Sequence, residues 1–289
     1  FDRGFFRGVE VVRAGKLRET LANDFGVRLF NTDIGSKWDV DKKLVAEEGL
    51  AEFLPQTAEA NAEIITDFLD RYKVVYAKPA RGTQGRNVFR VRYRRRKVAY
   101  EAHTRRGRII RASVPTTEQL MQALKATREK SPFIVQQGLT LARVEGRTTD
   151  LRALVQRDRS GTWRLTGVGV RIGGHSNVVS NLHAGGRAAK LDVLIPRPER
   201  RTKVGELKKR IEDLVLQVAE VLGRDRLLGE LGIDLGLDTE GRLWIIEVNL
   251  RPGRATFRRA GLTEAWRRSG RAPLEFALHL WGEDRDARD

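Results

Sequence analysis

The chain has 289 residues, of which 40% are hydrophobic, enough to bury one sizeable core or two moderate ones. It contains no cysteine, which excludes disulfide stapling and thiol catalysis and fits a reducing compartment. No run is long and apolar enough to span a bilayer, and residues 1–13 lack the apolar stretch of a signal peptide. The expected location is therefore cytoplasmic, without a membrane partner.

The formal net charge is +17, and basic residues gather in several clusters along the chain. These clusters are Arg92–Lys97, Arg105–Arg108, Arg197–Lys203 and Arg254–Arg259. Such clusters could bind nucleic acid, but aromatic residues are not interleaved with them as a base-stacking platform requires. An anionic small substrate or peptide explains the charge at least as well, so both interpretations stay open.

Helical and strand patterns alternate through the first half of the chain and predict a small α+β unit. Helices are predicted at Asp41–Leu54, Thr57–Arg71 and Thr116–Glu129, and strands at Val74–Lys78, Asn87–Tyr93, Val98–Ala102, Arg108–Ala112 and Phe133–Gln137. The second half predicts strands at Leu151–Arg157, Trp163–Ile172 and Leu231–Leu237, and helices at Lys203–Leu222 and Leu274–Trp281. The pattern predicts two lobes of mixed structure.

A glycine-rich loop follows the strand that ends at Lys78. It contains Gly82, Thr83, Gln84 and Gly85 and leads into another strand. Glycines let backbone amides approach an anion closely, and the lysine adds a positive charge, which suits phosphate binding. The loop joins strand to strand, so it lacks the helix of the Rossmann fingerprint and the Walker spacing. Taken alone, the loop is more typical of an ordinary hairpin, and only the predicted metal site downstream favours phosphate binding.

Three oxygen-bearing side chains stand close together near the C-terminal end of the predicted sheet. Glu247 and Asn249 are two residues apart and share one face of a strand, and Asp234 can lie opposite them across the turn Asp238–Gly241. Mg²⁺ prefers oxygen ligands and usually completes its coordination with substrate phosphates. The segment therefore predicts a magnesium site, with polar residues at a hairpin mouth as the alternative.

Several motifs, in this order, resemble the ATP-grasp superfamily. They are KPARGTQGRNV at Lys78–Val88, FIVQQGL at Phe133–Leu139, TDLRALV at Thr149–Val155, SNLHAGG at Ser180–Gly186, and IDLGLD followed by IIEVNLRPG. Together with FNTDIGSKWDVDKKL at Phe30–Leu44, they are most similar to the spore-coat-associated YheC/YheD group. RimK-type and D-alanine ligases are more distant. The resemblance implies an α+β ATP-grasp fold, in which two lobes clasp the nucleotide.

The resemblance assigns the nucleotide-binding residues of this chain. Lys78 and Lys37 match the two lysines that contact the nucleotide, although Ser36 replaces the aspartate that precedes the second lysine in many relatives. The loop Arg81–Arg86, with Gly82, Thr83, Gln84 and Gly85, is expected to fold over the phosphates. The hinge that presents adenine with backbone groups consists of Gln136, Gln137, Gly138 and Leu139.

The resemblance also implies residues that act on the transferred phosphoryl group. Asp150 and Arg152 match a DxR segment, Arg171 matches a basic residue on a neighbouring strand, and Asn181 lies in the SNLHAGG loop. RimK-type ligases carry an arginine before the corresponding Ser-Asn pair, where this chain has Val179. We therefore expect Arg152, Arg171 and Asn181 to be catalytic, without expecting the substrate of those ligases.

The expected function is an ATP- and Mg²⁺-dependent ligase that joins a carboxylate and an amine through an acyl-phosphate. The alternatives are a nucleotide-binding, spore-coat-associated scaffold without turnover and a basic nucleic-acid-binding module. The expected partners are small-molecule or peptide substrates. We expect the end of an N-terminal pre-ATP-grasp domain at residues 1–35, a first lobe at 36–138 and a second lobe at 139–289. An N-terminal Rossmann-like domain is expected to be largely absent from this chain.

Overall fold

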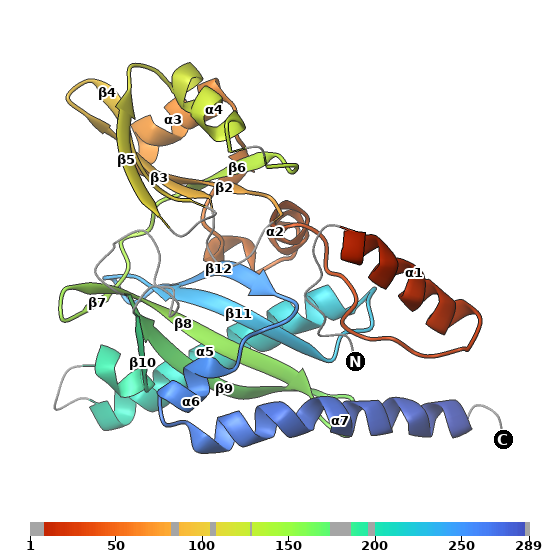
Figure 1. The fold of residues 1–289 in the computed structure, drawn as a ribbon. Coiled ribbons are helices and arrows are strands. Elements are labelled where there is room, and N and C mark those ends of the chain that lie inside the picture. Colours follow the sequence, from red (N-terminus) through yellow and green to blue (C-terminus); the bar gives the residue numbers. More distant parts are fainter. Residues whose placement is uncertain are drawn as a thin grey trace.

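The computed structural model describes residues 9–81, 87–104, 108–127, 129–173, 186–195 and 200–286. Two six-stranded antiparallel sheets form the centres of two lobes, which lie one above the other in Figure 1. This arrangement confirms the predicted α+β class. No helix in the described part of the chain combines the length and the apolar character needed to cross a bilayer.

The first lobe has a sheet with the strand order β1-β6-β2-β3-β4-β5. Its strands are β1 (Thr57–Glu59), β2 (Val74–Pro79), β3 (Val88–Arg94), β4 (Lys97–His103), β5 (Ile109–Val114) and β6 (Phe133–Gln137). Helices α3 (Ala62–Tyr72) and α4 (Thr117–Lys125) pack against each other and the sheet. Apolar residues at helical spacing on α3, including Ile65 and Leu69, are fully buried in this core.

The second lobe is a three-layer structure with helices on both faces of its sheet (Figure 1). The strands are β7 (Arg143–Val144), β8 (Arg147–Arg157), β9 (Trp163–Ile172), β10 (Arg187–Ala189), β11 (Glu230–Leu237) and β12 (Leu243–Asn249). The helix α5 (Arg200–Gly223) and the short 3₁₀ helix η3 (Leu191–Leu194) lie on one side, and α6 (Ala255–Arg259) and α7 (Thr263–Asp286) lie on the other. Strand β11 is buried along its whole length, as a central strand covered on both faces must be.

A short helix, α2 (Lys37–Val45), connects the two lobes. Ser36 caps it in a capping box with Asp39, which satisfies two backbone donors at its start. Its Val40 and Leu44 side chains join the core of the second lobe, whereas the Lys37 backbone donates a 2.8 Å hydrogen bond to Ala80 of the first. The division of the chain at residues 35 and 138 stays a prediction.

Side-chain caps make the bounds of two predicted helices wrong. The helix predicted at Asp41–Leu54 begins at Lys37, because Ser36 is its cap, and ends at Val45, before the separate 3₁₀ helix η1 (Ala51–Phe53). The helix predicted at Thr57–Arg71 is divided, because Thr57–Glu59 pairs with β6 and Asn61 caps α3. In both cases a side-chain cap, rather than apolar periodicity, sets where the helix begins.

Helix α7 extends well beyond the predicted Leu274–Trp281, and α1 (Val9–Asn23) was not predicted. The sequence places Pro273 inside α7, where it lacks the N–H that would bond to the carbonyl of Ser269. That carbonyl instead accepts a 3.1 Å hydrogen bond from Gln156 on β8. Tertiary contact therefore compensates for the proline and lets the helix continue.

Candidate functional site

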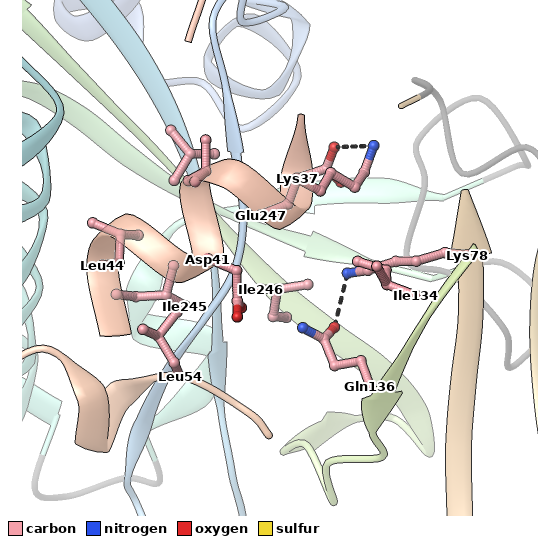
Figure 2. A pocket seen from close by; sticks show the side chains of 12 residues that line it. Lys37, Asp41, Leu44, Leu54, Lys78, Ile134, Gln136, Ile245, Ile246 and Glu247 are labelled. Carbon is pink, nitrogen blue, oxygen red and sulfur yellow. Dashed lines mark hydrogen bonds and ion pairs between the residues drawn. The ribbon is translucent and has the colours of Figure 1, made fainter. Parts of the chain in front are cut away.

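A small pocket lies between the two sheets and is lined by residues of both lobes and of α2 (Figure 2). Its volume is about 30 Å³, which has room for one or two water molecules. Charged and amide groups converge on it from several elements, and the remaining wall is apolar. The lining residues are Lys37, Val40, Asp41, Leu44, Leu54, Lys78, Ile134, Gln136, Ile245, Ile246, Glu247 and Val248.

Lys78 reaches this pocket from the end of β2 and is only 9% exposed. Its Nζ donates a 2.8 Å hydrogen bond to Oε1 of Gln136, whose Nε2 in turn donates to Thr57 Oγ1 at 3.0 Å. Burial lowers the pKa of Lys78 to about 8, although the carboxylate of Glu247 opposes the shift. The lysine is thus held in place, and its desolvation outweighs the attraction of the carboxylates of Glu247, Asp41 and Asp234 for its protonated form.

Lys37 enters from the first turn of α2 and lies 3.3 Å from Glu247 Oε1 (Figure 2). Because Ser36 caps the helix and the Lys37 backbone is bonded to Ala80, the helix start is fixed relative to the strand that carries Lys78. The two lysines predicted to contact the nucleotide therefore line one pocket. Ser36 is the N-cap of α2, a role that aspartate at this position would fill equally well.

Asp41 is a pocket residue that the sequence analysis did not identify. It lies four residues after Lys37 and thus on the same face of α2. Burial raises its pKa to about 6, against the opposing effects of Thr57 and Lys78. The capping box formed by Ser36 and Asp39 was the signal that could have placed Asp41 on this face, because it fixes where the helix begins.

The predicted hinge follows β6 and is tied to the first lobe by backbone hydrogen bonds. Gln137 N–H donates to Gln56 O, and Gly138 N–H donates to Val74 O, each at 2.9 Å. A Cβ atom on Gly138 would lie 2.5 Å from Val74 O, which explains why glycine occupies this position. The backbone N–H groups of Gln137 and Gly138 therefore already have partners within the first lobe. Leu139 is the hinge residue that follows them.

A row of paired charges crosses the second sheet. Arg152 and Asp234 are opposite each other on β8 and β11, and Asp150 and Arg171 are opposite each other on β8 and β9. Arg152 makes a bidentate pair with Asp234 at 2.5 and 3.0 Å, and Arg171 makes one with Asp150 at 2.5 and 2.8 Å. Arg171 Nη2 also lies 3.0 Å from Asp234, which links the two pairs.

The environment of this row acts differently on its two carboxylates. Burial raises the pKa of Asp150 to about 6, even though Arg171 counteracts it. Burial acts in the same direction on Asp234, but Arg152 and Arg171 together outweigh it and lower the pKa of that carboxyl. Asp234 therefore stays ionised at neutral pH and can serve as an anionic ligand.

Asp234, Glu247 and Asn249, the predicted metal ligands, lie on adjoining strands. Asp234 is opposite Glu247 in the register of β11 and β12, and Asn249 Nδ2 donates to Asp234 Oδ2 at 3.3 Å. Within the described residues, no three His, Cys, Asp or Glu side chains form a cluster suited to a metal. Two carboxylates and an amide oxygen fit Mg²⁺ that shares its coordination with phosphates, rather than an all-protein cage.

Several predicted site residues lie outside the described residues. They are Gly82, Thr83, Gln84 and Gly85 of the phosphate loop and Asn181 of the SNLHAGG segment. The strands that flank the phosphate loop are described, and β2 pairs with β3 in antiparallel register. The roles of all the predicted site residues stay predictions.

The sequence model of the YheC/D-like ATP-grasp family matches residues 26–280 of this chain. The chain belongs to that family. The curated relatives include two proteins of Bacillus subtilis (strain 168), and the family membership confirms the resemblance found in the sequence. The chain is 27% identical to the endospore coat-associated protein YheD over 267 residues, covering 91% of this chain and 58% of YheD. It is 24% identical to the endospore coat-associated protein YheC over 288 residues, covering 98% of this chain and 78% of YheC.

The chain thus spans less than two thirds of the length of YheD. Solved structures of the ATP-grasp ligase PsnB are similar in fold. The complex of PsnB with a phosphomimetic variant of its minimal precursor, Mg and ADP has a TM-score of 0.53 at 16% identity, covering 93% of this chain and 69% of PsnB. The complex with the minimal precursor has a TM-score of 0.51 at 16% identity, covering 88% and 70%. This likeness confirms the ATP-grasp fold.

Proposed function

We propose that this family member is an ATP- and Mg²⁺-dependent ligase that joins a carboxylate to an amine through an acyl-phosphate. The observation that carries the proposal is the convergence of Lys78, Lys37 and Glu247, from three separate elements, on one pocket between the lobes. Two lysines and a carboxylate are the groups expected around a magnesium polyphosphate. The family and fold support the same activity.

The pocket divides chemically into two ends in a way that suits a nucleotide. Lys37, Lys78 and Glu247 supply charge, whereas Leu44, Leu54 and Ile245 supply apolar wall. We assign the phosphates to the charged end and the base to the apolar end, with the hinge beside it. We expect the pocket to widen when a nucleotide binds, because its cavity is about 30 Å³.

In the proposed reaction, an oxygen of the substrate carboxylate attacks the terminal phosphorus of ATP. The bond between that phosphorus and the bridging oxygen breaks, and ADP leaves with the electron pair. The amine nitrogen then attacks the carbonyl carbon of the acyl-phosphate, the carbon–oxygen bond breaks, and phosphate departs while the nitrogen loses a proton. An amide, ADP and phosphate result, without a covalent intermediate on the protein.

We assign to the charged row the positioning of these groups. Its bidentate pairs engage Nε and Nη2 of both Arg152 and Arg171, and we assign each Nη1 to a substrate oxygen. Carboxylates on both sides of Arg171 hold its guanidinium in one orientation, so little reorganisation is needed when charge develops. We assign to these arginines, together with Asn181, the stabilisation of the acyl-phosphate.

Mg²⁺ held by Asp234, Glu247 and Asn249 would neutralise charge on the phosphates. In the structure, Lys37 is paired with Glu247 at 3.3 Å. We infer that, with magnesium nucleotide bound, Glu247 would be available to hold the metal and Lys37 would pair with a phosphate. This change of partners keeps each buried charge compensated in both states, as a partly desolvated site requires.

The experiment that tests the function is the release of ADP and phosphate with magnesium ATP against pools of amino acids and short peptides. We expect substrate-dependent release in the wild type and a loss of about a hundredfold or more in Glu247→Ala, since electrostatic stabilisation of the transition state is removed. Full turnover by a folded Glu247→Ala protein would show that the metal assignment is wrong.

A second candidate function is a nucleotide-binding scaffold without turnover. It is favoured by the names of YheD and YheC, which describe those proteins as endospore coat-associated. Spore association of this chain is part of the same proposal. Tight ATP binding without ADP release against every acceptor pool would support the scaffold, and absence of ATP binding would contradict both candidates.

A further inference from the structure

One charged group in the pocket has no task in the proposed reaction. It is Asp41, which lies one helical turn after Lys37 on α2 and lines the same cavity. Figure 2 shows its carboxyl group between the polar ends of Lys78 and Gln136 on one side and an apolar wall on the other. The wall includes Leu44, Leu54 and Ile245. The position suits a group that contacts a ligand.

Asp41 has unused hydrogen-bonding capacity in the free protein. An ionised carboxylate accepts up to about four hydrogen bonds and donates none. Thr57 is the hydrogen-bonding neighbour of Asp41, but its single hydroxyl proton is also within 2.9 Å reach of the Pro55 carbonyl oxygen, which competes for it. Within the described part of the chain Asp41 forms no ion pair, although Lys78 attracts it. The carboxylate can therefore accept hydrogen bonds from a ligand.

A carboxylate at this position costs the free protein stability. Moving a carboxylate out of water is unfavourable unless donors or cations compensate for the lost hydration. Asparagine would occupy the same space without the charge, and the wall beside Asp41 is already apolar. A group that costs stability inside a pocket is typical of a binding site, where the ligand supplies the missing partner.

The surroundings of Asp41 indicate which donor fits. The apolar end of the pocket is assigned to the base of the nucleotide, and the hinge N–H groups of Gln137 and Gly138 already have partners within the first lobe. Side chains therefore carry more of the base recognition. Adenine presents an exocyclic amine, which donates hydrogen bonds, where guanine presents a carbonyl oxygen. A carboxylate attracts the amine and repels the oxygen.

We propose that Asp41 accepts a hydrogen bond from the exocyclic amine of adenine and thereby makes the site selective for ATP over GTP. The inference rests on the proposed ATP-dependent function and adds a specificity residue to it. Helix α2 then contacts the nucleotide at two places, with Lys37 at a phosphate and Asp41 at the base. The capping box that fixes the start of α2 positions both side chains.

Calorimetry of the full chain with three magnesium nucleotides tests this role. ATP carries the amine, purine riboside 5′-triphosphate lacks it, and GTP has an oxygen in its place. We expect the wild type to bind ATP at least about tenfold more tightly than either analogue, because the analogues lose a hydrogen bond to a charged group.

Two variants of Asp41 separate the parts of this interaction. In Asp41→Ala the amine has no acceptor, so ATP and purine riboside 5′-triphosphate should bind with equal affinity. In Asp41→Asn the amide N–H can face the guanine oxygen, so the preference for ATP over GTP should fall at least about tenfold. Asp225→Asn is the matched control, because Asp225 is exposed, pairs with Lys43 of the same helix and lies outside the pocket lining. It should keep the wild-type preference.

Three outcomes would overturn the proposal, and they are distinguishable. Equal losses of affinity for all three nucleotides in the Asp41 variants would assign Asp41 to the ribose or to the support of Lys78. Wild type that binds ATP and GTP equally well would refute the role of Asp41 and leave the ATP-dependent function standing. Wild type that binds no nucleotide would contradict that function and this inference together. Circular dichroism of each variant checks that it is folded.

Discussion

Strands β8 and β11 carry two buried rungs on the same sheet face, each rung being a pair of polar residues opposite each other, and the surroundings of the two rungs differ. In the first rung Gln156 is opposite Glu230. In the second, four residues farther along the strands, Arg152 is opposite Asp234. Gln156 bonds to Glu230, to Thr166 and to the Ser269 carbonyl of α7, at 2.9, 2.7 and 3.1 Å. The structural helices therefore take part directly in the first rung.

Glu230 of the first rung also pairs with Arg254 at 3.3 Å, but the second rung is bonded mainly to charged groups. Arg152 and Arg171 both bind Asp234, and the carboxylate of Asp234 also contributes to the electrostatic environment of Lys78 in the pocket. The comparison shows how one sheet face serves two purposes. Where α7 contacts the face, the network includes neutral and backbone groups that hold the fold, and farther along it consists of paired charges that a ligand can rearrange.

The largest expected effect distinguishes the two rungs. Asp234→Asn leaves Arg152 and Arg171 with one carboxylate fewer, and we expect a loss of about 3–5 kcal/mol in the free energy of unfolding together with loss of ATP turnover. Glu230→Gln should also destabilise the fold, by about 1–3 kcal/mol, because Glu230 is buried, accepts a hydrogen bond from Gln156 and pairs with Arg254. Its turnover per folded molecule should stay normal. Urea denaturation and ADP release measure both quantities, and normal turnover in Asp234→Asn would refute the contrast.

The next effect concerns Lys78 and pH. Burial places its pKa at about 8 in the free protein, and a bound phosphate should raise that pKa. Binding therefore takes up a proton above pH 8, so ATP affinity should be constant below pH 8 and fall by up to about tenfold per pH unit above it. Calorimetric titration between pH 7 and 9 measures the slope. Lys78→Arg should remove the slope, since arginine stays charged, and an unchanged slope would exclude Lys78 as its origin.

A smaller effect is expected at Asp41. Its pKa is about 6 in the fold, against an ordinary value of 3.8, so the folded protein bears the cost of a partly buried carboxylate above pH 6. Below pH 4 the group is protonated in both states and the cost vanishes. Asp41→Asn should thus stabilise the fold by up to about 2 kcal/mol at pH 7.5, less near pH 5, as thermal denaturation at both values would show. A gain independent of pH would contradict this account.

The sequence predicted the strands that carry the site better than the helices around it. Strands Phe133–Gln137 and Trp163–Ile172 have the predicted bounds, because strong β-forming residues and turns define them. The sequence predicted that Asp234 lies near Glu247, because the single turn Asp238–Gly241 joins their two strands. The Arg152–Asp234 pair depends on register between distant strands, and Asp41 depends on where α2 begins, so neither follows from local pattern.

The smallest expected effect concerns two helix caps, one beside this site and one away from it in the first lobe. Ser36 and Thr116 both accept a backbone hydrogen bond at a helix start, α2 in the first case and α4 in the second. Each change to alanine should cost about 1 kcal/mol of stability. Only Ser36→Ala should also weaken ATP binding, because α2 positions Lys37. Equal ATP affinities for the two variants, measured by calorimetry, would show that the cap has no bearing on the pocket.

The most direct test of the account is whether Mg²⁺ strengthens ATP binding by way of Glu247 on β12. Calorimetry with and without Mg²⁺, on the wild type and on Glu247→Gln, measures this coupling, and Glu247 is only partly buried, so the variant should fold. The account predicts that Mg²⁺ strengthens ATP binding in the wild type and has little effect in the variant. An equal magnesium effect in both proteins, or no ATP binding in the wild type, would contradict it.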